Sequence, residues 1–124
     1  MVTKGDLRIE LNELAGYDIT NGFRSAVTAR AGGAATALWT TTTTPARTAG
    51  KVTSIYHIEF HNPTAGAVTA WLEIGGVAIT VPVPIDAGTT EMVDYRVPII
   101  AGDNDVNLNA TANGVQCMIT GIEV

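Results

Sequence analysis

The chain has 124 residues, which is enough for one domain with a core of its own, and its net charge is −5. Its seven lysines and arginines are scattered singly, so the sequence lacks the basic patch that nucleic-acid binding requires. No stretch approaches the run of about 20 apolar residues that crosses a membrane. We therefore expect neither nucleic acid nor a membrane as a partner.

The composition favours contact with other proteins. Only 15% of the residues are charged, whereas eighteen are threonine and seventeen are alanine. A surface so poor in charge suits a protein that lies against other protein better than a freely diffusing monomer. The single cysteine, Cys117, excludes an internal disulfide framework, and its place in an apolar phase predicts a buried small hydrophobe.

The first part of the chain carries mixed signals. Leu7, Ile9 and Leu11 alternate as in a strand, but Leu7, Leu11 and Leu14 also fit one face of a helix, so both structures stay open. No apolar segment follows Lys4, and we expect no secretory signal. A turn at residues 21–22, a strand over residues 24–30 and a glycine-rich joint at residues 31–34 follow.

A run of five threonines, residues 40–44, follows Leu38 and Trp39. Because β-branched side chains favour extended chain, the run is either a strand with one solvated face or an arm that lies across a neighbouring subunit. We expect residues 1–50 to form an N-terminal arm and the first strands. Residues 51–124 are expected to form a β-sandwich core, within one domain overall.

From Lys51 onward the strand pattern is regular. Alternating apolar residues predict short strands, and Gly-Gly at 75–76 and Asn-Gly at 113–114 predict hairpin turns. Two cassettes, Pro-Ile-Asp-Ala-Gly at 84–88 and Pro-Ile-Ile-Ala-Gly at 98–102, each end a strand and begin a turn. The spacing predicts an all-β fold, an antiparallel β-sandwich or jelly roll with an extended N-terminal arm.

The alternation also predicts which side chains face the core. Gly121 coincides with a change of apolar phase in the last strand and therefore predicts a β-bulge. In two other strands one phase is expected to point inward, namely Val52, Tyr56, Ile58 and Phe60 in the first and Val93, Tyr95 and Val97 between the cassettes.

Residues 57–61 form the one candidate metal site in the sequence. On a strand His57, Glu59 and His61 share a face, as metal ligands on β-strands do. The two histidines are then roughly 13 Å apart, which is too far for one ion. The chain has no third histidine. We therefore expect a polar strand face here, and neither a metal nor another cofactor.

Enzymatic chemistry is not expected. Neither serine, Ser25 or Ser54, lies in the Gly-x-Ser-x-Gly motif of a nucleophile elbow. The cluster at residues 103–105, Asp-Asn-Asp, fits a turn better than a calcium loop. The carboxylates in the strands occupy positions expected to face solvent, namely Glu59, Glu73, Glu91 and Asp94.

Several features of residues 44–124 occur together. They are a Thr-Pro-Ala lead-in at 44–46, an apolar strand at 52–55, an Asn-Pro-Thr loop with small residues at 62–68, the two cassettes and the closing strand at 115–124. In this combination the chain resembles the small β-sandwich virion structural proteins of tailed bacteriophages, of the head decoration or cement type. The likeness covers about two thirds of the chain.

The resemblance implies a capsid decoration protein that binds the outer surface of a phage head and stabilises it by bridging neighbouring subunits. Its partner would be the major capsid protein, and it would form a homo-oligomer, a trimer. It would reside on the capsid surface of the virion, after assembly in the host cytoplasm. The expected interface residues are Leu7, Ile9, Leu11, Trp39, Thr41, Thr43 and Trp71, with core packing an equal alternative for the two tryptophans.

A phage tail-fibre or receptor-binding domain that recognises carbohydrate is the alternative. It would use aromatic side chains that stack on a sugar ring and amides that bind its hydroxyl groups. The candidate residues are Trp71, Tyr56 and Tyr95 for stacking, and Asn107 and Asn109 for hydrogen bonding.

Overall fold

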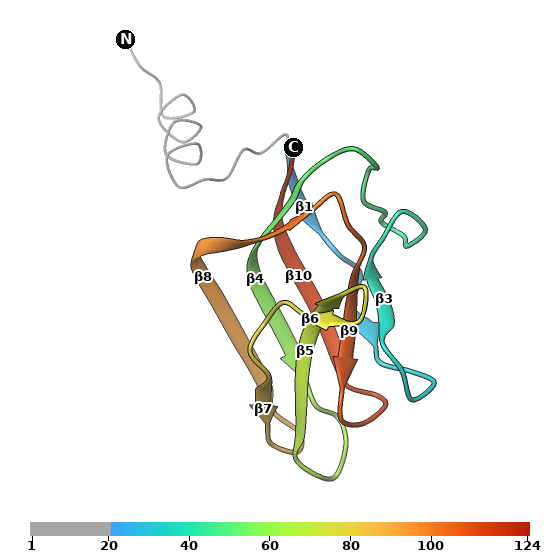
Figure 1. Ribbon diagram of the computed structural model, residues 1–124. Coiled ribbons are helices and arrows are strands. Elements are labelled where there is room, and N and C mark those ends of the chain that lie inside the picture. Colours follow the sequence, from blue (N-terminus) through green and yellow to red (C-terminus); the bar gives the residue numbers. More distant parts are fainter. Residues whose placement is uncertain (1–20) are drawn as a thin grey trace.

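The computed structural model describes residues 21–124, which form two antiparallel sheets packed face to face (Figure 1). The first sheet contains β1 (Gly22–Arg24), β2 (Thr28–Ala29), β4 (Thr53–His61), β8 (Thr90–Gly102) and β10 (Gln116–Glu123). The second sheet contains β3 (Thr36–Trp39), β5 (Val68–Ile74), β6 (Val77–Ala78), β7 (Val83–Ile85) and β9 (Val106–Ala110). The expected antiparallel β-sandwich is confirmed.

The chain passes repeatedly between the two sheets of the sandwich. The first sheet runs β1-β10-β4-β8, with β2 also paired to β10, and the second runs β3-β9-β5-β6, with β7 also paired to β5. From β2 onward the chain changes sheet at every connection except those that join β5, β6 and β7. Strands that alternate between two packed antiparallel sheets in this way form a β-sandwich.

The part of the chain before residue 51 contributes to both sheets. β1 and β2 pair with β10, and β3 pairs with β9. The two ends of the described chain lie close together, because Glu123 donates its backbone N–H to the carbonyl of Asn21. Leu7, Ile9 and Leu11, which we expect at an interface, lie outside the described residues.

The core lies between the sheets and receives the inward side chains of both. Trp39 is only 2% exposed, and its ring stacks on Phe23 with 4.3 Å between the ring centroids. Its indole N–H donates to the Thr53 hydroxyl at 3.3 Å. Trp39 therefore takes the core alternative, and its side chain is not on the surface of this chain as the interface prediction requires.

A bulge occurs at Gly121, but its extra residue lies in β4 and not in the last strand. The predicted change of apolar phase in the last strand is wrong, since β10 alternates regularly from Gln116 to Glu123. Thr120 is opposite His57 and Gly121 is opposite Ile55, so Tyr56 of β4 has no counterpart in β10. This extra residue reverses the phase of β4, and Ile55 becomes fully buried. The prediction that Val52 and Tyr56 share the inward phase with Ile58 and Phe60 is therefore wrong.

The threonine run forms a compact loop rather than a strand. Thr43 accepts the backbone N–H of Thr40 at 3.1 Å and donates its hydroxyl to the Thr40 carbonyl at 3.0 Å. Arg47 continues the loop and donates to Asp103 at 2.6 Å and Asp105 at 2.7 Å in the turn between β8 and β9. The loop is thus fastened to its own chain. That Thr41 and Thr43 contact a neighbouring subunit stays a prediction.

Candidate functional site

One side of the sandwich is open, and we call it the open flank. It consists of residues 79–84 at the edge of the second sheet and residues 93–99 of β8 at the edge of the first, on the side where Figure 1 shows β7 and β8. Between them lies a groove of about 440 Å³. Its lining is mostly apolar and comprises Ile79, Thr80, Val81, Pro82, Val83, Pro84, Val93, Tyr95 and Ile99.

The local sequence explains why this side stays open. Pro82 precedes β7 and Pro84 lies within it, and neither has a backbone N–H, so residues 79–84 cannot complete a continuous edge strand. In β8, residues 95–98 stand opposite the single residue Tyr56 of β4 and bulge away from the sheet. Val97 lies in this bulge and is 81% exposed, so the prediction that it faces inward is wrong.

The open flank exposes apolar side chains that a partner could cover. Val81 is 83% exposed, close to the value for Val97. Full burial of one valine contributes about 1.5 kcal/mol or more, so a few such side chains are enough for a specific contact. The bulge and Pro98 disfavour addition of a further strand along β8, because they interrupt the edge hydrogen bonds. The arrangement therefore suits side-chain packing into the groove.

The outer face of the first sheet carries a charged cluster around His57. The His57 Nδ1 atom is 2.5 Å from Asp94 Oδ1 on β8, and Nε2 is 3.1 Å from Glu59 Oε1 on the same strand. Partial burial alone would lower the pKa of His57, but the hydrogen bonds and attraction of both carboxylates outweigh it and raise that pKa above 6.5. The protonated ring, with two N–H donors, therefore ties β8 to β4.

We expect the His57 cluster to make stability depend on pH. A histidine with a raised pKa in the folded state stabilises the fold fully below its unfolded value of about 6.5, and this contribution disappears as pH rises through the folded value. In urea titrations from pH 5.5 upward, His57→Gln should lose most stability at the acidic end and little above the folded pKa. His61→Gln is the control, since His61 bonds the uncharged Thr90 hydroxyl. An equal loss at every pH would contradict the assignment.

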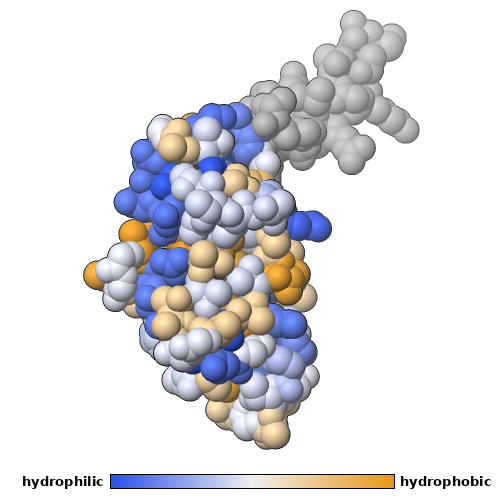
Figure 2. All heavy atoms as spheres, turned by 90° about the vertical axis from the view of Figure 1, so that its right-hand side faces the viewer, coloured by the Kyte–Doolittle hydropathy of each residue, from blue (hydrophilic) through white to orange (hydrophobic). Residues whose placement is uncertain are grey.

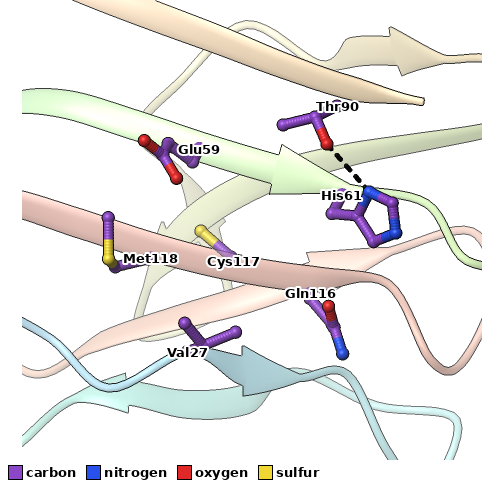
Figure 3. Close-up of a pocket in the computed structure, with 7 residues that line it drawn as sticks. All are labelled: Val27, Glu59, His61, Thr90, Gln116, Cys117 and Met118. Carbon is purple, nitrogen blue, oxygen red and sulfur yellow. Dashed lines mark hydrogen bonds between the residues drawn. The ribbon is translucent and has the colours of Figure 1, made fainter.

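A small hollow of about 210 Å³ lies beside this cluster, between β4, β10 and the loop that contains Val27 (Figure 3). His61 bonds the Thr90 hydroxyl at 2.8 Å, and Figure 3 shows its ring on the side away from Glu59. His57 and His61 are thus held by different partners. Among residues 21–124, no three His, Cys, Asp or Glu side chains are close enough together to hold a metal ion.

Cys117 lies beneath this hollow and is 1% exposed. Burial, and to a lesser degree the charge of Glu59, raises the pKa of its thiol, so the sulfur stays protonated at neutral pH. A protonated, buried thiol is not a nucleophile. The prediction that Cys117 is a small buried hydrophobe is confirmed.

Polar residues and one tryptophan share the outer face of the second sheet. Trp71 and Glu73 of β5 stand opposite Asn109 and Asn107 of β9. The structure thus brings together three of the residues that the carbohydrate alternative names. Tyr56 and Tyr95 belong to the first sheet and are not part of this face.

The opposite edge of the sandwich differs from the open flank. Figure 2 shows it from the side of β3, and polar and apolar residues are mixed there in small patches. The sequence reasoning missed the groove on the open flank. The Val-Pro-Val-Pro repeat at residues 81–84 was the available signal, since alternating prolines leave an edge unpaired.

No known protein family, curated protein or solved structure matches the chain. In the part of the chain that the structure describes, no helix is long and apolar enough to cross a membrane.

Proposed function

We propose that the protein is a structural component of a bacteriophage virion, a decoration protein that binds the outside of the capsid and bridges neighbouring copies of the major capsid protein. The observation that carries this proposal is the open flank, where Val81 and Val97 are exposed beside an apolar groove. Monomeric proteins rarely leave such apolar surface uncovered, and patches of this kind mark interaction sites. The sequence resemblance of residues 44–124 supplies the virion context.

The proposed mechanism is mechanical. Each protomer places its open flank against a capsid subunit, and a trimer repeats the contact three times around one axis. Because linked contacts bind at high effective concentration, three weak contacts hold the capsid subunits together far more strongly than one. The low content of charged residues, 15%, suits such packing against other protein.

The proposal is tested by mass measurements on the full chain. Sedimentation velocity should give the mass of a trimer, and the protein should pellet with purified heads of the phage that encodes it. A trimer that stays in the supernatant would instead support the fibre or receptor-binding alternative. A monomer that also ignores the heads would refute the assembly argument as a whole.

We expect Val97→Glu and Val81→Glu to weaken binding to heads at least tenfold each, because each places a charge where the partner covers a methyl group. Since both side chains point into solvent in the isolated chain, the free energy of unfolding should change by less than about 0.5 kcal/mol. Binding isotherms on heads and urea titrations measure the two effects.

Val27→Glu is the matched control, since Val27 is also exposed but lies beside β1 and β2, at the other edge of the first sheet. It should bind heads as the parent protein does. Equal losses for all three variants would show that added negative charge, and not the flank, causes the effect.

A further inference from the structure

The outer face of the second sheet presents an ordered group of side chains, which we call the indole face. It comprises Trp71, Glu73, Asn107, Asn109 and Arg30. In the register of β5 and β9, Trp71 is opposite Asn109 and Glu73 is opposite Asn107, so these four side chains project from the same side of the sheet. Arg30, from the segment after β2, reaches the group from the edge.

Hydrogen bonds fix the ring of Trp71. Its Nε1–H donates to Glu73 Oε2 at 3.0 Å, and Asn109 Nδ2 donates to the same oxygen at 3.2 Å. Arg30 Nε in turn donates to Asn109 Oδ1 at 3.3 Å. Because Nε1–H lies in the ring plane, its bond to the residue two positions along β5 holds the indole in one orientation. The ring remains partly exposed, whereas Glu73 is buried.

Two other polar groups on the indole face have no hydrogen-bond partner among the described residues. The amide of Asn107 makes no hydrogen bond to another residue within 21–124, and the Oε1 atom of Glu73 likewise has no partner in that range. Asn107 is partly exposed. The face therefore offers a fixed aromatic ring, and beside it an amide that can both donate and accept hydrogen bonds.

We propose that the indole face binds a carbohydrate. A pyranose ring presents C–H groups on one side, which are attracted to the negative face of an indole, and hydroxyl groups around its rim. The hydroxyls would bond Asn107 and the neighbouring polar groups, which fix the orientation of the sugar. Nucleic acid fits less well, because the chain carries net charge −5 and a carboxylate lies directly beside the ring.

Each residue of the indole face has a distinct role in the proposed binding of carbohydrate. Trp71 is the aromatic platform, Asn107 the free hydrogen-bonding group, and Glu73, Asn109 and Arg30 position them. This site is separate from the open flank, since it lies on the outer face of the second sheet and shares no residue with the groove. The proposal therefore stands independently of capsid binding.

The test is a screen of the full chain on an array of bacterial surface polysaccharides and their oligosaccharide fragments, followed by titration of the best oligosaccharide. Because Trp39 is 2% exposed, ligand-induced changes in tryptophan fluorescence should come from Trp71. Trp71→Ala should weaken binding at least tenfold, Trp71→Phe should weaken it less, and Asn107→Ala should weaken it several-fold.

Val97→Glu, on the open flank, is the control and should bind the oligosaccharide normally. Circular dichroism melting of each variant separates loss of binding from loss of fold, and Trp71→Phe and Asn107→Ala keep the test decisive if Trp71→Ala unfolds. The proposal is overturned if the protein binds no glycan on the array. It is also overturned if a bound glycan leaves the fluorescence unchanged and binds the Trp71→Phe and Asn107→Ala variants with full affinity.

Discussion

Gly121→Ala is expected to remove a large part of the stability of the fold. A Cβ atom at this position would lie 1.9 Å from the backbone oxygen of Ser54 and 3.0 Å from the Phe23 ring. The oxygen belongs to the main chain of β4, so it cannot turn away as a flexible side chain could. The two central strands of the first sheet must separate at the bulge, and we expect a loss of about 3 kcal/mol or more in the free energy of unfolding.

Urea titration of the parent and the variant measures this loss. Gly66→Ala is the matched control, since a Cβ there meets nothing within 4 Å and the residue has no positive φ. The control should change stability by less than about 1 kcal/mol, and by removing backbone freedom from the unfolded chain it should act in the stabilising direction. A loss below 1 kcal/mol in Gly121→Ala would contradict the close approach of β10 to β4.

The bulge also shows how far sequence patterns extend. Gly121 was identified from the sequence as an irregular position, although β10 itself keeps one phase throughout, with Gly121 and Glu123 buried. The sequence pattern indicated only that the pairing is irregular here. It could not predict that the extra residue lies in β4, because this depends on which strand is paired with the last one and in which register. The inward position of Ile55 follows only from that pairing. Local alternation therefore predicts where strands occur better than it predicts which of their side chains face the core.

The strand between the two cassettes gives a second example. Its existence was predicted from alternation, and β8 is indeed a single long strand, which continues through the whole second cassette to Gly102. The outward position of Val97 was not predicted, since the bulge at residues 95–98 arises from the mismatch with β4 and not from any signal within the strand. The open flank depends on this bulge, so the sequence carried a signal only for its other side, the Val-Pro-Val-Pro repeat at residues 81–84.

The indole face was partly accessible from the sequence. Trp71, Asn107 and Asn109 occupy solvent phases of alternating segments, which was enough to group them as candidates for sugar binding. That Trp71 and Asn109 are direct cross-strand neighbours required the pairing of β5 with β9, two strands that are far apart in the chain. The same pairing excluded Tyr56 and Tyr95, which lie in the other sheet.

The loop that follows β4 is held by one buried side chain, that of Asn62, which is 0% exposed. Its amide nitrogen donates to the carbonyl of Gly66 at 2.8 Å and to that of Ile85 at 3.1 Å. Its Oδ1 atom accepts the backbone N–H of Thr64 at 2.9 Å and the Thr64 hydroxyl at 2.6 Å. One amide thus closes its own loop and joins it to β7 in the other sheet.

Asn62→Ala should therefore destabilise the fold by about 2–4 kcal/mol, because it removes all four hydrogen bonds of a fully buried amide. Asn62→Asp should be no better at neutral pH, since it keeps the acceptor and replaces the donor by a buried charge. Asn104→Ala, which removes one bond to Ala101 at an exposed turn, should cost less than about 1 kcal/mol. Urea titrations rank the three variants, and equal losses at residues 62 and 104 would mean that the loop is held by its backbone alone.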